Sequence, residues 1–426
     1  MIYALKDGSK VLSKLRITYK VIRFIASGGQ GEVYEVEDTK SGQRYALKWY
    51  FKHSATPYQK KLIERLIERG APDGRFLWPL DIIFKDDLFG YVMRLRPPVY
   101  KSVVDLMKRR AEPTFSALCM AGINLADGYQ SLHSKGFCYR DISFGNLFFN
   151  PKDGDVLICD NDNVTVNMDT ESATNGTPRF IAPEIIAKKK SPSTETDLYS
   201  MAVLLFYMFM LHHPLEGAVE ANIKCFDAKA MEKIYGHDPV FIWDPVNQSN
   251  RPIKGYQDNA IIFWHMYPPY FRDMFTRAFT KGLFDGKARI VEKEWKDTFA
   301  KLRNSILYCQ TCGKENFFKK TPVCWACNAT ISSPSKLNIN GQLVMLNYNS
   351  VIYNHHLRGD FDFSAAQGKM SQHPSQPGKW GLTNTGKDSW TFTRPNGDTA
   401  VIEPGKTAPL LNGAKINFGV AEGIIE

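Results

Sequence analysis

Four polar features follow one another in the first 160 residues, and their order constrains the fold more than any other part of the chain. The stretch "IASGGQGEVY" (25–34) places a glycine-rich turn between two strand-like segments, and Lys48 ends the next apolar segment. The stretch "YRDISFGNLFF" sets Asp141 and Asn146 five residues apart, and Asp160 follows the apolar run "DVLIC". If the four features act together, the fold must bring a lysine, two carboxylates and a carboxamide beside the turn.

This combination suits phosphoryl transfer from a nucleotide. Glycines let backbone N–H groups approach phosphates, and a lysine can bind the same groups. Asn146 and Asp160 offer oxygen ligands to Mg²⁺ or Mn²⁺, and Asp141 can orient or deprotonate an attacking hydroxyl. Taken singly, the turn reads as an ordinary hairpin and Lys48 as a surface charge, so the prediction rests on the order of all four features.

Residues 18–305 resemble a protein kinase domain. The stretch "SGGQGEVY" resembles the glycine-rich loop, "YRDISFGN" the catalytic loop, and "GTPRFIAPE" (176–184) the end of the activation segment. The resemblance implies that Asp141, Lys48 and Glu64 are the catalytic residues, with Glu64 bracing Lys48 from the helix predicted at 57–69; Glu68 is the weaker alternative partner. The ATP-binding residues that it implies are Ala26, Ser27, Gly28, Gly29, Gly31, Val33, Ala46, Lys48 and Met93.

The same resemblance implies structural roles for four further residues. We expect Asp197 to brace the backbone of the catalytic loop and Arg289 to pair with Glu184. Thr170, Ser172 and Thr174 are candidate phosphorylation sites, and Arg140 is placed to bind such a phosphate. The alternative is an ordinary polar loop.

Several positions depart from the kinase pattern. Ala26 replaces the first glycine of the loop, Tyr139 replaces a histidine, and Ser143 stands where serine/threonine kinases place a lysine. Asn161 and Asp162 replace the Phe-Gly that usually follows the metal-binding aspartate, and Asp162 reads as an extra or a competing metal ligand. All four polar residues needed for chemistry are kept, so we expect an active, though weakened, Ser/Thr-directed kinase. The alternative is a pseudokinase scaffold that binds nucleotide and partner proteins.

A second motif follows in "CQTCGKENFFKKTPVCWAC", where two Cys-x2-Cys pairs lie eleven residues apart. Two Cys-x2-Cys motifs at this spacing predict a tetrahedral Zn²⁺ site formed by Cys309, Cys312, Cys324 and Cys327. A rubredoxin-type iron site is the alternative. The motif resembles a zinc ribbon, and we expect the metal to be structural. Nucleic-acid binding is a further alternative, through Lys314, Lys319, Lys320, Phe317, Phe318 and Trp325.

After a Ser-, Pro- and Asn-rich stretch that reads as a linker (331–341), residues 342–426 alternate strand and turn signals. "LRGDFDFS" and "LLNGAKINFG" faintly resemble the first and last strands of forkhead-associated (FHA) domains. We expect a β-sandwich recognition module that docks a partner protein.

The predicted fold class is therefore α+β. We expect a bilobal protein-kinase-like domain at 1–305 (small lobe about 1–93, large lobe about 97–305), a zinc ribbon at 306–330, the linker, and the all-β domain. The net charge of +10 suits acidic partners or a solubilising surface equally. The longest apolar stretch, 201–211, is too short to cross a bilayer, and the N-terminal residues lack the apolar core of a signal peptide. We therefore expect a cytoplasmic protein without a membrane partner, and the similarity to kinases with an attached ribbon and β domain indicates the bacterial type.

Overall fold

The computed structural model describes residues 4–167, 176–319 and 322–426. Its internal contacts divide the chain into two compact units. The first unit comprises Met1–Pro113, Met120–Phe263 and Asp273–Trp295, and the second comprises Thr114–Cys119, Trp264–Arg272 and Lys296–Glu426. The division differs from the boundary expected at residue 305, because short segments around 114–119 and 264–272 group with the C-terminal part of the chain.

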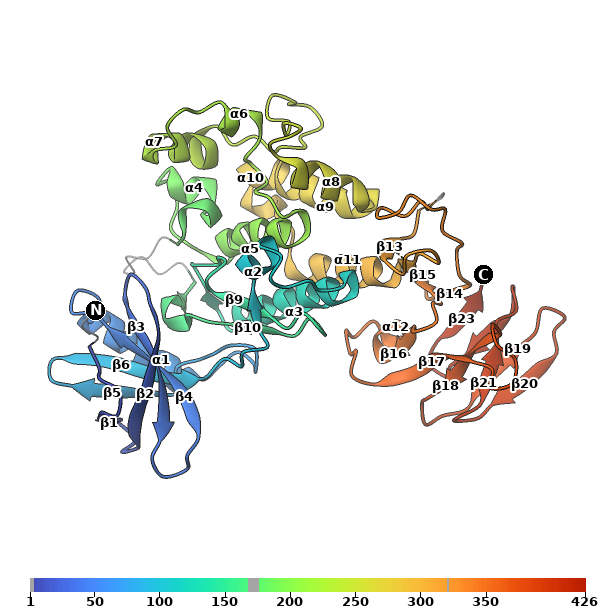
Figure 1. The fold of residues 1–426 in the computed structure, drawn as a ribbon, viewed down its shortest axis with the longest axis horizontal. Helices are drawn as coiled ribbons and strands as arrows, with labels where there is room; N and C mark the ends of the chain where they lie inside the picture. Colours follow the sequence, from blue (N-terminus) through green and yellow to red (C-terminus); the bar gives the residue numbers. More distant parts are fainter. Residues whose placement is uncertain (1–3, 168–175, 320–321) are drawn as a thin grey trace. The chain divides into compact units, whose positions relative to one another are not determined.

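The first unit begins with a six-stranded antiparallel sheet in the order β1-β2-β3-β4-β6-β5, with helix α1 beside it (Figure 1). Its elements are β1 (Lys10–Leu12), β2 (Thr18–Ser27), β3 (Gly31–Asp38), β4 (Arg44–Tyr50), α1 (Pro57–Arg69), β5 (Asp81–Lys85) and β6 (Leu88–Arg94). The glycine-rich turn of the expected small lobe thus lies between two strands, β2 and β3, as expected. Thr56 caps α1 by accepting a hydrogen bond from the Gln59 amide (3.1 Å), and Gly70 ends the helix with φ 70°.

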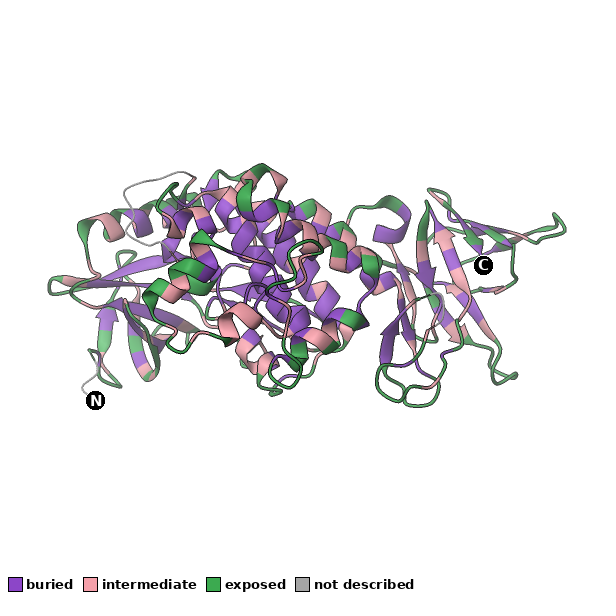
Figure 2. Cartoon of the chain, turned by 90° about the horizontal axis from the view of Figure 1, so that it is seen from above, coloured by how far each residue is buried: buried purple, intermediate pink, exposed green. Residues whose placement is uncertain are grey.

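Helices dominate the rest of this unit and surround α5 (Thr194–Met210), which contains all but the last residue of the apolar stretch 201–211. Nearly every α5 side chain from Thr196 onward is buried, and Figure 2 shows buried residues concentrated among the central helices. A helix that is apolar on all sides belongs in a protein core. The other helices that lie wholly or partly in this unit are α2 (Val103–Met107), α3 (Phe115–Ser134), α4 (Pro183–Ile186), α6 (Ala218–Ala221), α7 (Ala228–Glu232), α8 (Asp258–Met266), α9 (Pro269–Ala278), α10 (Lys281–Phe284) and α11 (Glu292–Asn304).

Short strands frame the polar loops that hold Asp141, Asn146 and Asp160. Strands β9 (Leu147–Phe149) and β10 (Val156–Ile158) pair antiparallel, with β7 (Lys101–Ser102) beside β9; β8 (Phe137–Cys138) pairs with β11 (Thr165–Val166). The catalytic loop lies between β8 and β9, and the 3₁₀ helix η1 (Asn161–Asn163) lies between β10 and β11. Because β9 and β10 are neighbours, Asn146 and Asp160 lie at the same end of one hairpin.

The second unit contains the cysteine cluster and the C-terminal strands. Strands β12 (Ile306–Tyr308) and β13 (Glu315–Phe317) form the hairpin of the cysteine segment. One six-stranded sheet has the order β15-β14-β23-β22-β19-β20, and a four-stranded sheet has the order β16-β17-β18-β21. Their elements are β14 (Lys336–Ile339), β15 (Gln342–Met345), β16 (Val351–Tyr353), α12 (Asn354–Arg358), β17 (Ala366–Gln372), β18 (Trp380–Asn384), β19 (Trp390–Thr393), β20 (Thr399–Ile402), β21 (Thr407–Pro409), β22 (Lys415–Asn417) and β23 (Glu422–Ile425).

The two C-terminal sheets share one hydrophobic core, which includes Leu337, Leu382 and Phe392. This core corrects the expected linker, because residues 336–339 form β14, which pairs with both β15 and β23. Leu337 and Ile339 alternate with polar residues and are both fully buried. The Ser, Pro and Asn residues on either side made this short strand read as linker.

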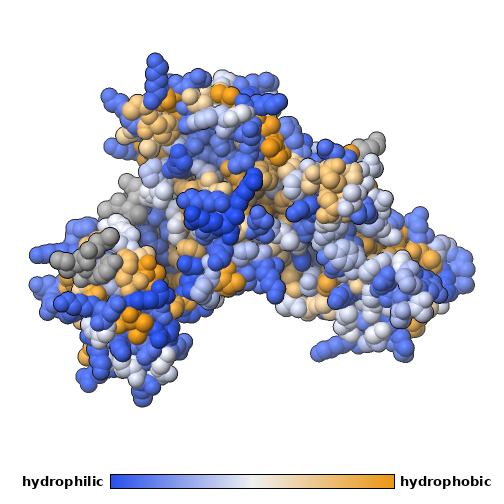
Figure 3. Space-filling model, in the orientation of Figure 1, coloured by the Kyte–Doolittle hydropathy of each residue, from blue (hydrophilic) through white to orange (hydrophobic). Residues whose placement is uncertain are grey.

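No helix in the described ranges is both long enough and apolar enough to cross a lipid bilayer. The face shown in Figure 3 is mostly hydrophilic, and its hydrophobic residues lie in small separate groups.

The buried position of Leu337 gives a test of the strand assignment. We expect Leu337→Ala to lower the free energy of unfolding of the C-terminal core by about 2–5 kcal/mol, because it leaves a cavity between two sheets. Urea denaturation followed by the fluorescence of Trp390, which lies in the same core, measures the change. Ser333→Ala, at an exposed position outside the sheets, is the control. Equal stability of the two variants would contradict the assignment.

Candidate active site and metal centre

Lys48 lies on β4 in the middle of the small-lobe sheet. It faces Val33 of β3 on one side and Tyr91 of β6 on the other, and Ala46 lies opposite Met93. Ala26 lies opposite Val33. The strand register therefore gathers the apolar residues expected at the ATP site around the lysine.

The glycine-rich turn connects β2 to β3. At Gly31 an added Cβ would collide with the carbonyl oxygen of Trp49, so the close approach of the two strands requires glycine there. Around Gly28 and Gly29 an added Cβ would meet nothing within 4 Å, so the backbone of the turn faces open space. These features fit a turn that receives phosphate groups through its backbone.

The ammonium group of Lys48 is buried and has three polar partners. It is paired with a carboxylate oxygen of Asp160, lies 2.8 Å from Oδ2 of Asp162, and donates to Oε1 of Gln30 over 3.1 Å. Burial disfavours the charge, but the two carboxylates outweigh it and raise the pKa of Lys48 above its ordinary value. The lysine is therefore charged, as phosphate binding requires.

Asp162 is the more deeply buried of the two carboxylates, with a side chain that is 0% exposed, against 35% for Asp160. Asp162 also accepts a hydrogen bond from the Tyr50 hydroxyl, and its backbone carbonyl accepts one from Nε2 of Gln59 on α1 (2.9 Å). Burial raises the pKa of Asp160, whereas the attraction of Lys48 outweighs burial at Asp162 and lowers its pKa.

Glu64 is not where the family resemblance placed it. Its carboxylate lies 3.0 Å from Nζ of Lys14, and the ion pairs among the described residues do not join it to Lys48. The physical reason is that Asp162 already occupies the buried side of Lys48. Sequence reasoning missed Tyr50, Gln59 and Gln30; Tyr50 could have been found, since it lies two residues after Lys48 on the same face of β4.

Asn161 stands where kinases usually have a hydrophobic residue, and its side chain is anchored by hydrogen bonds. Its side chain is fully buried, and Nδ2 donates to the carbonyl oxygens of Leu77 (2.9 Å) and Ile158 (3.0 Å). The segment that carries Asp160 and Asp162 is thus held by hydrogen bonds.

Asp197 braces the catalytic loop at the N-terminal end of α5. Its carboxylate accepts hydrogen bonds from the backbone amides of Tyr139 (2.5 Å) and Arg140 (2.9 Å). Tyr139 itself is fully buried, donates its hydroxyl to the carbonyl oxygen of Cys159, and packs edge-on against Tyr129. The tyrosine therefore supports the loop from beneath. Ser143 is buried and supplies no cation.

The sequence also missed His133, which joins Asp197 to α11. Nε2 of His133 lies 3.0 Å from Asp197, and Nδ1 is bonded to Glu292. Burial opposes a charge on the ring, but these two acids outweigh it and raise the pKa of His133 to about 9.

Asp141 is fixed by hydrogen bonds from two side chains, those of Asn146 and Thr177. Nδ2 of Asn146 donates to its backbone carbonyl (2.7 Å) and to Oδ2 (3.2 Å), and the Thr177 hydroxyl donates to Oδ1 (2.7 Å). The carbonyl of Asn146 accepts from the amide of Cys159 (2.8 Å), which brings Asn146 next to Asp160. The amide oxygen of Asn146 and the carboxylate of Asp160 are the hard oxygen donors that Mg²⁺ prefers, so the residues present fit this ion.

The end of the activation segment packs on the catalytic loop. Gly176 has φ 92°, and an added Cβ would lie 2.6 Å from the carbonyl oxygen of Arg140. Arg289 lies 2.8 Å from Glu184, the expected ion pair. The candidate phosphorylation sites Thr170, Ser172 and Thr174 lie outside the described residues.

The four cysteines of the second motif converge. Their sulfur atoms all lie within 4.8 Å of one another, and two pairs, Cys309–Cys327 and Cys312–Cys324, are 3.6 Å apart. A tetrahedral Zn²⁺ with Zn–S bonds of about 2.3 Å needs sulfur separations of roughly 3.8 Å, whereas a disulfide needs about 2.05 Å. The amide of Ala326 also points to Sγ of Cys324 (3.4 Å). The cluster therefore fits one structural metal ion.

The aromatic residues of this ribbon are partly committed to packing. Phe317 is buried against Phe115 and Tyr267, and Glu315 accepts hydrogen bonds from the backbone amides of Phe115 and Ser116 at the first turn of α3. Phe317 is therefore not available to stack on a base.

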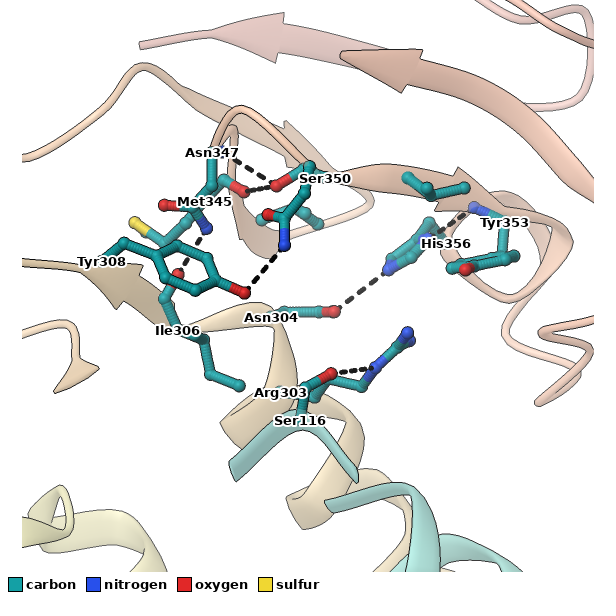
Figure 4. A pocket seen from close by; sticks show the side chains of 13 residues that line it. Ser116, Arg303, Asn304, Ile306, Tyr308, Met345, Asn347, Ser350, Tyr353 and His356 are labelled. Carbon is teal, nitrogen blue, oxygen red and sulfur yellow. Dashed lines mark hydrogen bonds between the residues drawn. The ribbon is translucent and has the colours of Figure 1, made fainter. Parts of the chain in front are cut away.

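A polar cavity of about 100 Å³ lies in the second unit between the end of α11, β12, β15 and β16 (Figure 4). Its side chains bind one another: His356 to Asn304 (3.0 Å), Asn349 to Tyr308 (2.8 Å), and Asn347 to the Ile306 carbonyl (2.7 Å). Burial lowers the pKa of His356 to about 3, so the ring is neutral. The cavity is a structural hydrogen-bond network.

Comparison with known proteins agrees with this site. Residues 19–262 match the family model of the protein kinase domain, which is more than half of the chain, and the chain therefore belongs to the protein kinase family. This family implies ATP and Mg²⁺ as cofactors.

Several serine/threonine kinases are similar over the same region. Serine/threonine-protein kinase PLK1 of Xenopus laevis is 31% identical over 221 residues, 50% of this chain and 36% of that protein. The probable serine/threonine-protein kinase CCRP1 of Zea mays is 28% identical over 204 residues (46% and 32%). Serine/threonine-protein kinase polo of Drosophila melanogaster is 28% identical over 210 residues (47% and 35%). The chain thus spans about a third of the length of these relatives.

The raised pKa of His133 predicts a pH-dependent stability. The stabilisation from its two acids is complete below the ordinary pKa of 6.5 and is lost as the pH rises through about 9. We expect wild-type stability to fall by roughly 3 kcal/mol more than that of His133→Gln over this range. Urea denaturation at a series of pH values measures the difference, with His237→Gln at an exposed position as the control. Identical pH slopes for wild type and His133→Gln would show that the interaction is absent.

Metal removal gives a second test. We expect metal analysis of the purified full chain to find about one zinc per chain, and Cys312→Ser to lose it. Loss of zinc should shift the fluorescence of Trp325, whose indole donates to the Glu315 carbonyl beside the cluster. Cys225→Ser, an exposed cysteine elsewhere, should keep the metal. Iron in place of zinc would support the rubredoxin-type alternative.

Proposed function

We propose that the chain is an ATP- and Mg²⁺-dependent protein kinase that transfers the γ-phosphate of ATP to serine or threonine hydroxyls of a protein substrate. The observation that carries the proposal is the convergence of Lys48, Asp141, Asn146 and Asp160 on one site, with Asp141 fixed by Thr177 and Asn146. The similarity to serine/threonine kinases supports the choice of hydroxyl.

In this proposal each residue has one task. The glycine-rich turn and Lys48 hold the phosphates, and Asp141 accepts or directs the proton of the attacking hydroxyl. Asn146 and Asp160 would hold Mg²⁺, and a bound Mg²⁺ would supply positive charge beside the phosphate oxygens. Asp197 keeps the loop amides in place, so that Asp141 needs little rearrangement when substrate binds.

Ser143 lowers the expected rate. The cation that serine/threonine kinases place there is absent, so one source of charge stabilisation for the transferred phosphate is missing. Ala26 adds a methyl group near the glycine-rich turn, so we expect a slow enzyme.

For the second unit we propose a role in recognition. The zinc ribbon is a structural module, and the C-terminal β domain, with its faint FHA resemblance, docks a partner protein. Nucleic acid is the weaker proposal for the ribbon, since Phe317 is buried. Action in bacterial signalling and in the cytoplasm stays a prediction from the sequence.

Autophosphorylation tests the proposed activity. We expect the full chain to incorporate labelled phosphate from ATP and Mg²⁺ on serine or threonine, and Asp141→Asn to lose about 100-fold or more of the rate. Asp238→Asn, which changes an exposed acid in the same way, is the control. Mass spectrometry locates the phosphate and determines whether Thr170, Ser172 or Thr174 carries it.

Two failures have different meanings. If wild type incorporates no phosphate but ATP still raises its melting temperature, the pseudokinase scaffold replaces the kinase. If Asp141→Asn incorporates phosphate at the wild-type rate, Asp141 does not have the proposed role.

A further inference from the structure

We infer that Asp162 is the residue that positions Lys48 for the nucleotide phosphates, in place of the helix glutamate that the family resemblance assigns to Glu64. Asp162 is a positioning residue, since it acts through Lys48. The inference deepens the proposed function and rests on it for its catalytic consequence, but the geometry of nucleotide binding tests it separately.

All three hydrogen-bond donors of the Lys48 ammonium group have partners. Its ammonium group has three N–H donors, and the structure directs them at Asp160, Asp162 and Gln30. A phosphate oxygen can bind only where one of these partners leaves. The partner that remains bonded to Lys48 when a phosphate binds is the one that positions its ammonium group.

The partners of Lys48 differ in how deeply they are buried. The Asp162 carboxylate has no exposed surface, whereas about a third of the Asp160 side chain is exposed and Gln30 belongs to the glycine-rich turn. Moving Asp162 away would leave Lys48 as a buried charge without its deepest partner, which is costly. Asp160 is partly exposed and can turn towards a metal ion, so of the two carboxylates Asp162 is the partner that stays.

Asp162 is itself fixed by hydrogen bonds from Tyr50 and Gln59. The Tyr50 hydroxyl donates to its carboxylate, and Nε2 of Gln59 contacts both the Asp162 backbone carbonyl (2.9 Å) and the Tyr50 oxygen (3.2 Å). A carboxylate fixed by such supports is suited to orient a cation. Helix α1 therefore contributes a neutral amide to the site, and one of its two acids, Glu64, pairs with Lys14.

Two substitutions at position 162 separate charge from shape. Asp162→Asn keeps the size of the side chain and removes the charge, and Asp162→Glu keeps the charge and adds a methylene group. If Asp162 positions Lys48 by its charge, Asp162→Asn should weaken ATP binding by at least about tenfold, and Asp162→Glu should retain more affinity than Asp162→Asn. A role in packing alone predicts the reverse order, because the buried site has no room for a longer side chain.

The measurement is the Kd of the full chain for ATP with Mg²⁺ and with EDTA, by titration calorimetry, together with the melting temperature of each variant. Asp238→Asn, the same carboxylate-to-amide change at an exposed position, is the matched control and should bind ATP as wild type does. Glu64→Gln should lose much less affinity than Asp162→Asn. In the double variant Lys48→Met/Asp162→Asn, the loss should be no larger than in Lys48→Met alone, since the two residues act as one unit.

Wild-type affinity in a folded Asp162→Asn, or a full loss in Glu64→Gln beside an unaffected Asp162→Asn, would overturn the inference. Loss of affinity in Asp162→Asn that appears only with Mg²⁺ and not with EDTA would also overturn it, because Asp162 would then be a metal ligand. These binding readouts need no phosphate transfer. A wild-type chain that binds ATP but does not phosphorylate therefore refutes the proposed function and leaves the inference to be decided by the Kd values.

Discussion

The site depends on one buried ammonium group. Lys48 lies in the middle of a six-stranded sheet, where a charge is costly unless it is paired, and the pairing fixes the segment that carries Asp160 and Asp162 against β4. Asp162 in turn receives Tyr50 from the same strand and Gln59 from α1. A single cation thereby links the sheet, the helix and the segment that carries Asp160 and Asp162.

The catalytic loop is organised by an opposite charge. Asp197, buried at the start of α5, accepts two backbone amides of the loop and is bonded to His133, which reaches Glu292. The path of the loop is therefore held by hydrogen bonds to its backbone as well as by the packing of its side chains. Tyr139 illustrates this, because its ring fills the space beneath the loop and its hydroxyl binds a backbone carbonyl.

The sequence allowed the strands that flank the glycine-rich turn, the Asp197 and Arg289 contacts and the converging cysteines to be predicted, because each depends on local pattern or fixed spacing. The catalytic roles of Lys48, Asp141, Asn146 and Asp160 stay a prediction. The partner of Lys48 could not be predicted in this way. Glu64 and Asp162 are both acids that the sequence offers as partners, and only the three-dimensional structure shows that Asp162 pairs with Lys48 while Glu64 pairs with Lys14. Strand β14 was missed for a different reason, since two buried apolar residues are too few to stand out among serine, proline and asparagine.

The most direct test of this account is an experimental structure of the full chain with Mg²⁺ and a non-hydrolysable ATP analogue. The account predicts that Nζ of Lys48 contacts the phosphates and Asp162 together, that Asp160 has turned to the metal ion, and that Glu64 still pairs with Lys14. A structure in which Lys48 pairs with Glu64 while Asp162 ligates the metal ion would contradict it.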